Sequence, residues 1–255
     1  MSYQYIETGF SDGLGTITLN RPPVNILNIA MMEEINQLLE EWRGKKDLKV
    51  ALFNAKGKCF SAGVDVGEHM GDLAPKMIEV FHRMFRLMDR LGATTVASVY
   101  GSCLGGGCEL AIFCDLVLAS QDAKFGQPEI QVGVFPPIAA QFMPRIIGRK
   151  AAMELILSGR IVSAEEARQM GLVNRVVSRE DLESATSDFV KPYLKLSAEV
   201  LRITKKAVVA GLMDDLEPSL KLIEDIYLNE LMKTADANEG LKAFMEKRRP
   251  EWRNE

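Results

Sequence analysis

The stretch that decides the fold is Thr94-Thr-Val-Ala-Ser-Val-Tyr100 followed by Gly101-Ser-Cys-Leu-Gly-Gly-Gly-Cys-Glu-Leu110. Its first half is a short, apolar and largely β-branched run, which predicts a buried strand. Its second half is a glycine-containing turn that leads into a helix, and backbone N–H groups at such a helix start can bind an anion. A triple glycine by itself is also typical of a tight turn that lets a helix pack close to a strand.

A second glycine turn, Cys59-Phe-Ser-Ala-Gly-Val-Asp65, follows another strand-like run, Leu48-Lys-Val-Ala-Leu-Phe53. Neither turn continues into the Gly-Lys-Ser/Thr of a phosphate loop. Neither has the Gly-x-Gly-x-x-Gly spacing, with an acidic residue farther on, that is typical of dinucleotide binding. The two turns therefore predict a pair of backbone N–H sites rather than a nucleotide loop.

Strand-like and helical patterns alternate around these turns. Residues 14–19 alternate as a strand does and end at Arg21-Pro22-Pro23, while residues 31–42 and 75–91 place apolar residues at helical spacing. The methionines of residues 75–91 are interpreted as core residues rather than as metal ligands.

Helices dominate the last third of the chain. Ser163-Ala-Glu-Glu166 is a capping box, and Gly171 closes the short helix that it opens. From about Arg179 onward the strand signal fades. We therefore predict an α/β core over residues 1–190 and a helical C-terminal region over residues 191–255.

Composition excludes several classes of protein. The chain has 255 residues, of which 47% are hydrophobic and 26% charged, which is typical of a globular protein with a large core. Its formal net charge of −4 argues against a general binder of nucleic acid or anionic membranes. Its longest uncharged stretch, residues 91–108, is interrupted by glycines and is not a membrane span. The N-terminal residues lack the features of an export signal, so a cytoplasmic location is expected.

Cysteine and histidine are scarce. The four cysteines form no Cys-x-x-Cys pair, which fits buried free thiols in a reducing compartment. The two histidines, His69 and His82, are interpreted as structural, and no metal site is predicted. Ser61 and Ser102 have no histidine in their motifs to activate them, which argues against serine hydrolysis. The chemistry is therefore expected to use carboxylates and backbone groups.

Two glutamates stand beside the glycine turns. Glu109 follows the triple glycine at the start of a helix, and Glu129 follows Pro128 in Phe125-Gly-Gln-Pro-Glu-Ile130. Each can also be explained as a first-turn glutamate favoured by the helix dipole. A catalytic role for either one needs the other close by.

These segments together resemble the enoyl-CoA hydratase/isomerase (crotonase) superfamily. The resemblance rests on four motifs that occur in the family's order: Phe60-Ser-Ala-Gly-Val-Asp65, Leu104-Gly-Gly-Gly-Cys-Glu-Leu110, Phe125-Gly-Gln-Pro-Glu-Ile130 and Ala164-Glu-Glu-Ala-Arg-Gln-Met-Gly-Leu-Val173. It extends from Thr16-Ile-Thr-Leu-Asn-Arg-Pro22 to Phe244-Met-Glu-Lys-Arg248, nearly the whole chain. It implies a crotonase-like spiral of strand-strand-helix units, with a helical C-terminal region used in trimer packing.

The resemblance also assigns site residues. It implies that the backbone N–H groups of Ala62 and Gly106 form an oxyanion hole for a thioester carbonyl. It implies that Glu109 activates a water molecule while Glu129 delivers a proton to carbon. Substrate-binding roles fall on Gly63, Asp65, Gly105 and Pro137. From the sequence alone Asp65 is better explained as a helix N-cap. Lys56 or Lys58 could approach the phosphates of coenzyme A, although exposed lysines of this kind are usually solvated.

Two segments point to a narrower group within the superfamily. Gly133-Val-Phe-Pro-Pro137 and Pro22-Pro-Val-Asn-Ile-Leu-Asn28 depart from the common pattern of short-chain enoyl-CoA hydratases. Both resemble the cyclohexa-1,5-diene-1-carbonyl-CoA hydratases. The expected activity is therefore hydration of an α,β-unsaturated acyl-CoA thioester, and the narrower resemblance implies a cyclic dienoyl-CoA as the substrate.

Alternatives remain open at this stage. Among enzymes they are an enoyl-CoA isomerase, a short-chain enoyl-CoA hydratase and a thioesterase, and outside enzymes an RNA-binding crotonase homologue. The resemblance further implies a homotrimer or a hexamer built as a dimer of trimers. No cofactor is expected, since coenzyme A is part of the substrate, and neither nucleic acid nor membrane is an expected partner.

Overall fold

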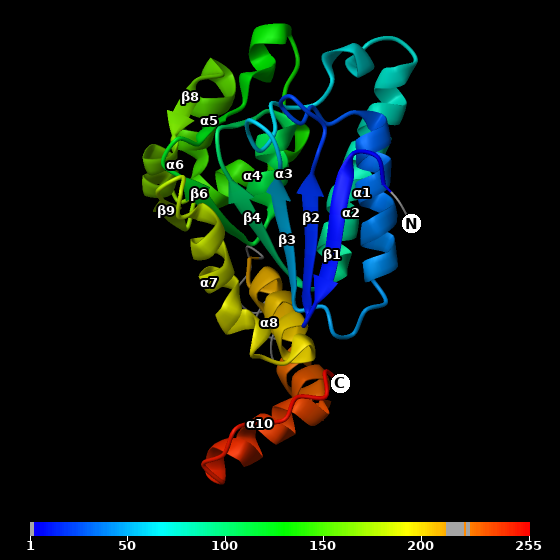
Figure 1. Ribbon diagram of the computed structural model, residues 1–255, viewed down its shortest axis with the longest axis vertical. Coiled ribbons are helices and arrows are strands. Elements are labelled where there is room, and N and C mark those ends of the chain that lie inside the picture. Colours follow the sequence, from blue (N-terminus) through cyan, green and yellow to red (C-terminus); the bar gives the residue numbers. More distant parts are fainter. Residues whose placement is uncertain (1–2, 213–221, 223–224) are drawn as a thin grey trace.

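A computed structural model describes residues 3–212, 222 and 225–255 (Figure 1). Its main sheet has six strands in the order β1-β2-β3-β4-β6-β9. They are Ile6–Ser11, Leu14–Leu19, Val50–Ala55, Thr94–Val99, Leu116–Ser120 and Arg175–Val177. β1 pairs antiparallel with β2, and every other pairing in this sheet is parallel. Parallel strands require crossover connections, which here are mostly helical.

The three strands that the sequence patterns predict, at residues 14–19, 48–53 and 94–100, are found within two residues of their predicted bounds. β2 covers the predicted residues 14–19, and its buried and half-buried residues alternate as predicted for a strand with one face on the core. β3 begins two residues later than the predicted run, at Val50, because Leu48 lies in the preceding turn.

Two long helices, α1 (Ile29–Trp42) and α2 (Leu73–Leu91), pack side by side against one face of the sheet (Figure 1). Asn28 caps α1 by accepting a hydrogen bond from the N–H of Met31. α2 ends at Gly92, whose φ of 72° allows the left-handed turn. Both helices begin two residues earlier than the apolar spacing predicts, at Ile29 and at Leu73.

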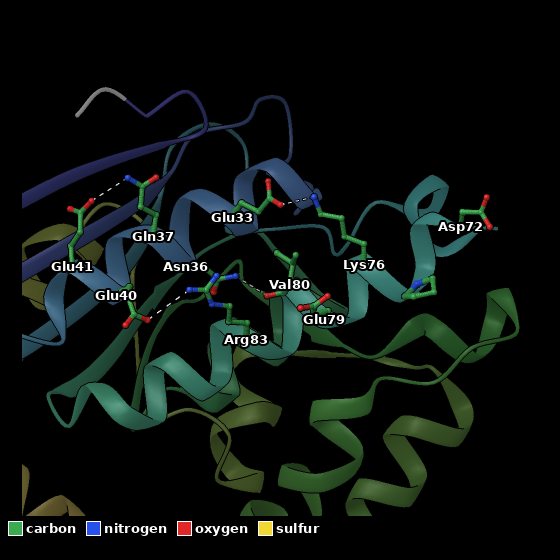
Figure 2. Close-up of a pocket in the computed structure, with 11 residues that line it drawn as sticks. Glu33, Asn36, Gln37, Glu40, Glu41, Asp72, Lys76, Glu79, Val80 and Arg83 are labelled. Atoms are coloured by element: carbon green, nitrogen blue, oxygen red, sulfur yellow. Dashed lines mark hydrogen bonds and ion pairs between the residues drawn. The ribbon is translucent and has the colours of Figure 1, made fainter.

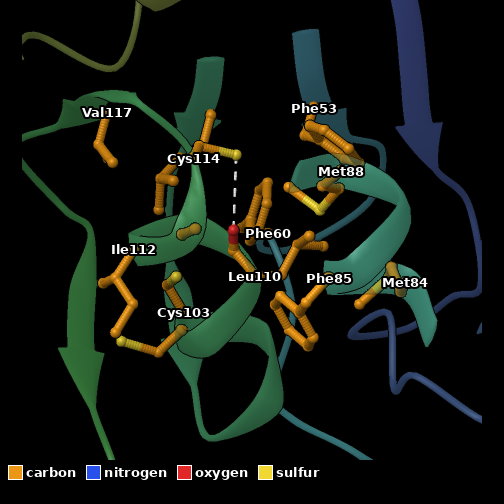
Figure 3. Close-up of a cluster of buried hydrophobic side chains, with 14 of the residues drawn as sticks. Phe53, Phe60, Met84, Phe85, Met88, Cys103, Leu110, Ile112, Cys114 and Val117 are labelled. Carbon is orange, nitrogen blue, oxygen red and sulfur yellow. Dashed lines mark hydrogen bonds between the residues drawn. The ribbon is translucent and has the colours of Figure 1, made fainter. Parts of the chain in front are cut away.

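The core lies between this face of the sheet and α2. Met84, Phe85 and Met88 of α2 pack with Phe53 of β3 and with Leu110 (Figure 3). The prediction that these methionines are core residues is confirmed. All four cysteines are free and buried, as predicted.

A smaller, three-stranded sheet positions the site. Its strands are β5 (Ser102–Leu104), β7 (Lys124–Gly126) and β8 (Ile161–Ser163), in that order. β5 and β7 are parallel, and each is followed by a helical segment: α3 (Gly106–Phe113) after β5 and the 3-10 helix η2 (Pro128–Val132) after β7. The ends of neighbouring parallel strands lie at the same edge, so Glu109 of α3 and Glu129 of η2 are brought together.

The remaining elements form the outer layer and the C-terminal region. They are η1 (Val66–His69), α4 (Pro137–Ile147), α5 (Arg149–Ser158), α6 (Ala164–Met170), α7 (Leu182–Leu194), α8 (Ala198–Ala210), η3 (Ile226–Glu230), η4 (Leu231–Lys233) and α10 (Ala235–Met245). The predicted capping box is confirmed, since Ser163 accepts a hydrogen bond from the N–H of Glu166 and Gly171 closes α6.

The C-terminal helices extend away from the sheet (Figure 1). α7 runs through residue 190, so the division of the chain at that residue stays a prediction. Within the described ranges, every helix is too short or too polar to span a membrane.

Candidate active site

Glu109 is buried in the first turn of α3, with 2% of its surface exposed. Its Oε1 atom accepts hydrogen bonds from the N–H groups of Ile138 at 2.7 Å and Ala139 at 2.9 Å. Both donors belong to the first turn of α4, where N–H groups have no partner within the helix. The N-terminus of α4 therefore holds the Glu109 carboxylate, and the helix dipole favours a negative charge there.

Glu129 lies close enough to Glu109 to affect its charge, on the other side of the candidate active site. A Cβ atom built on Gly105 would stand 2.8 Å from Oε1 of Glu129, so this carboxylate lies directly against the turn before α3. The side-chain amide of Gln127 is fully buried beside it. With its nitrogen facing these acceptors, Gln127 donates to the two carboxylate oxygens at 3.2 and 3.3 Å and to the carbonyl of Gly105 at 3.3 Å.

Burial changes the acidity of both carboxyl groups. Burial and, to a smaller extent, the nearby charge of Glu129 together raise the pKa of Glu109 to about 8, against the lowering effect of the two N–H donors. Burial also raises the pKa of Glu129, to about 7. Near neutral pH the pair can therefore hold one proton, which is the arrangement that acid–base chemistry by two carboxyl groups needs.

The two glycine turns run side by side next to these carboxyl groups. Ser61 and Cys103 form a parallel bridge, and the N–H of Leu104 donates to the carbonyl of Ser61 at 3.0 Å. Continuing the same register places Val64 opposite Gly106. Their contact confirms it, because a Cβ atom built on Gly106 would stand 2.4 Å from Cγ2 of Val64.

The expectation for Ala62 in the oxyanion hole is wrong in this structure. The N–H of Ala62 donates to the carbonyl of Val24 at 3.0 Å and is not free. The N–H of Gly63 faces Oγ of Ser61 at 3.3 Å, and that of Asp65 donates to Leu27. Within the described part of the chain, the N–H groups of Val64 and Gly106 have no partner. The free donors at this place are thus Val64 and Gly106.

The other residues predicted for substrate binding lie around this space. Gly63 and Gly105 adopt positive φ angles of 119° and 52°, and each contacts the neighbouring turn. Pro137 is the first residue of α4, immediately before the two donors to Glu109. Asp65 caps η1 by accepting from the N–H of Gly67, as the sequence alone indicates, and it lies 3.8 Å from the guanidinium of Arg21.

Comparison with known proteins identifies the family of this chain. The family described as Enoyl-CoA hydratase/isomerase matches residues 9–255. The chain belongs to the enoyl-CoA hydratase/isomerase family. Named hydratases among its relatives, over nearly the whole chain, support an enzyme of the hydro-lyase type. The superfamily resemblance and the crotonase-like fold expected from sequence are confirmed.

Three relatives show how far the similarity extends. A cyclohexa-1,5-dienecarbonyl-CoA hydratase of Thauera aromatica is 38% identical over 239 residues, covering 93% of this chain and 92% of the relative. A short-chain-enoyl-CoA hydratase of Clostridium acetobutylicum is 31% identical, with 93% of each chain covered. The crystal structure of an enoyl-CoA hydratase from Bacillus anthracis superposes with a TM-score of 0.93 at 30% identity, covering 99% of this chain and 100% of the other.

A separate groove of this enoyl-CoA hydratase/isomerase family member lies between α1 and α2 (Figure 2). It has a volume of about 890 Å³, and ion pairs cross it between Lys76 and Glu33 at 2.8 Å and between Arg83 and Glu40 at 3.9 Å. Its charged side chains are thus largely paired across the two helices. Over the described residues, no group of three potential metal ligands is found there or elsewhere.

Sequence reasoning missed three parts of the site: Val64, Gln127 and the first turn of α4. Val64 stands inside a quoted motif, but only the pairing of the two turns shows which of its N–H groups is free. Gln127 stands two residues before Glu129, and a buried amide next to a carboxylate is the signal that could have indicated it. Pro136-Pro137 could have indicated a helix start whose following N–H groups are available.

Proposed function

We propose that this protein adds water to the double bond of an α,β-unsaturated acyl-CoA thioester. The observation that carries the proposal is that two carboxyl groups, the buried Glu109 and the half-buried Glu129, lie beside two unpaired backbone N–H groups, those of Val64 and Gly106. Attack on the β-carbon moves negative charge onto the thioester oxygen. Fixed N–H donors at that oxygen typically contribute roughly 10²–10³ in rate each.

The two carboxyl groups divide the proton transfers. In the proposed reaction, the Glu109 carboxylate takes a proton from the water as its oxygen bonds to the β-carbon. The protonated Glu129 gives its proton to the α-carbon. Ile138 and Ala139 stabilise the carboxylate form of Glu109, which supports its assignment as the base in the state in which Glu129 holds the proton of the pair. In the free protein Glu109 has the higher pKa, about 8 against about 7, so this step requires that the shared proton passes to Glu129. The reaction needs no electron transfer, so no cofactor beyond the coenzyme A of the substrate is proposed.

For the acyl group we propose a cyclic 1,5-dienoyl thioester. The 38% identity to the Thauera aromatica hydratase supports this choice. A second support is the Pro136-Pro137 start of α4, which restricts the backbone next to Glu109. A rigid pocket wall suits a planar ring of fixed shape, whereas a flexible acyl chain can adapt to walls of other shapes.

The coenzyme A end and the assembly complete the proposal. Lys56 forms an ion pair with Glu7 at 2.7 Å, whereas Lys58 is exposed with no ion pair to any described residue. Lys58 is therefore the better candidate for the phosphates. A homotrimer or hexamer in the cytoplasm, without nucleic acid or membrane partners, remains the proposed state, and size-exclusion chromatography with light scattering tests the assembly.

The experiment is incubation of the purified protein with cyclohexa-1,5-diene-1-carbonyl-CoA and, separately, crotonyl-CoA in oxygen-18 water. Label in the cyclic product alone supports the full proposal, and label in the crotonyl-CoA product favours the short-chain substrate. A shifted double bond without label indicates an isomerase, and released thiol indicates a thioesterase. Glu109→Gln and Glu129→Gln should each lower labelling at least 100-fold, and normal labelling in either variant contradicts the mechanism.

A further inference from the structure

Two aromatic side chains, Phe113 and Phe142, lie one helical turn beyond the hydrogen bonds that join Glu109 of α3 to the start of α4. On α3, Phe113 is four residues after Glu109, and on α4, Phe142 is four residues after Ile138. Residues four apart share a helix face. The two rings are in contact, with centroids 4.7 Å apart and planes tilted by 65°. The same two helices therefore meet twice: by hydrogen bonds at the site and by rings one turn away.

Two further aromatic rings, both from α2, extend this contact. Phe85 contacts Phe113 edge-on at 5.0 Å, and Phe81 contacts Phe85 at 4.8 Å. Phe81 in turn lies beside Gly106, since a Cβ atom built on that glycine would stand 3.3 Å from the ring. These four residues, Phe81, Phe85, Phe113 and Phe142, form an aromatic ladder that joins α2, α3 and α4.

The start of α4 depends on side-chain contacts of this kind. Pro144 has no N–H, so it cannot make the helical hydrogen bond to the carbonyl of Ala140. Residues 130–135, which precede the helix, are exposed and contribute little packing against the core. Packing of the helix's own side chains therefore helps to place its first turn: Ile138, Ala139 and Met143 are buried, and the ring of Phe142 contacts Phe113 at the end of α3.

We propose that Phe113 and Phe142 are positioning residues for Glu109: their contact sets the spacing of α3 and α4 at which the N–H groups of Ile138 and Ala139 reach the carboxylate. This inference rests on the proposed role of Glu109. Both rings are only half-buried, so truncating them loosens this spacing without emptying the core. The charge of Glu129 on η2 raises the pKa of Glu109, and the N–H groups of α4 lower it. The side that α2 packs against carries uncharged aromatic rings.

The test compares Phe113→Leu, Phe142→Leu and the double variant with Phe189→Leu. Phe189 makes a similar ring contact, with Tyr193 at 6.3 Å, on α7 and away from the site. The pKa of Glu109 is followed by carbon-13 NMR of its carboxyl group, assigned with Glu109→Gln. Weaker N–H donation raises this pKa, so a rise of at least half a unit is expected in the three ladder variants and none in Phe189→Leu.

Kinetics of hydration give the second readout. We expect kcat to fall roughly tenfold in each single ladder variant with little change in KM, and the double variant to fall no further. Phe142→Tyr, which keeps the ring, should restore both readouts. An unchanged Glu109 pKa in the ladder variants overturns the inference. A shifted pKa together with full hydration by Glu109→Gln would leave the positioning intact and contradict the proposed function instead.

Discussion

Glu129 lies so close to Gly105 that a Cβ atom built on Gly105 would stand 2.8 Å from its Oε1 atom. The backbone of Gly105 adds a second constraint, with φ at 52° and ψ at −131°, a conformation that L residues rarely adopt. Two constraints therefore favour glycine at this position: a side chain would collide with the proposed catalytic group Glu129, and the backbone conformation is one that other residues rarely adopt.

Replacing Gly105 with alanine should lower hydration by about 100-fold or more, because the new methyl group displaces the Glu129 carboxylate. Steady-state kinetics and thermal unfolding of Gly105→Ala are the measurements. Gly71→Ala is the matched control, since Gly71 has a similar φ of 57° but open space around its missing side chain. Equal kinetic losses in the two variants would show that backbone strain, not contact with Glu129, is responsible.

Gly106 should tolerate a methyl group only if Val64 becomes smaller. A Cβ atom on Gly106 would stand 2.4 Å from Cγ2 of Val64, a distance that forces the two turns apart. Gly106→Ala should therefore lose most of its hydration activity, and Gly106→Ala combined with Val64→Ala should recover much of it. A double-mutant cycle with Val64→Ala measures this coupling. Additive effects would contradict the opposed placement of Val64 and Gly106.

The sequence allowed prediction of the parts of the fold that local patterns determine. The alternation of residues 14–19, the methionine-rich stripe of α2 and the capping box at Ser163 are all confirmed, because each depends on neighbours within one element. The sequence also predicts each glutamate in the first turn of a helix. That the two meet follows from the parallel pairing of β5 with β7, which no local pattern specifies.

The free N–H group could not be predicted from local patterns. Ala62 and Val64 stand two residues apart, so in a regular strand their N–H groups would point the same way. Gly63 between them has a φ of 119°, which breaks this regularity. Which of them is free depends on Val24 and Leu27, which pair with this segment from far away in the sequence. The hydrogen bonds from Ile138 and Ala139 to Glu109 depend in the same way on how α4 packs on α3.

Gln127→Met should shift the pH dependence of hydration, because the amide donates to the Glu129 carboxylate and methionine does not. A donor to the charged form lowers a pKa, so its loss should raise the pKa of Glu129 above its value of about 7. The limb of the pH–rate profile that belongs to Glu129 should then move to higher pH. Methionine keeps the buried volume nearly constant. A profile that falls in amplitude without moving would contradict this role of Gln127.

Glu109→Gln should stabilise the protein at alkaline pH more than at acidic pH. The pKa of Glu109 is raised to about 8 from an ordinary value of 4.5, so the folded state holds a proton that the unfolded state releases. The wild type's stability from this group is complete below pH 4.5 and is lost as the pH rises through 8. The neutral glutamine does not suffer this loss.

Urea unfolding at pH 5, 7 and 8.5 measures this difference, which should grow in favour of Glu109→Gln with each step. Glu165→Gln is the control, since Arg168 lowers the pKa of the exposed Glu165 and its replacement cannot produce a gain that grows with pH. A difference between wild type and Glu109→Gln that stays constant across this range would mean that Glu109 is already ionised in the folded protein. In that case Glu129 alone would hold the proton of the pair in the free protein, and the reaction would not require a proton to pass from Glu109 to Glu129.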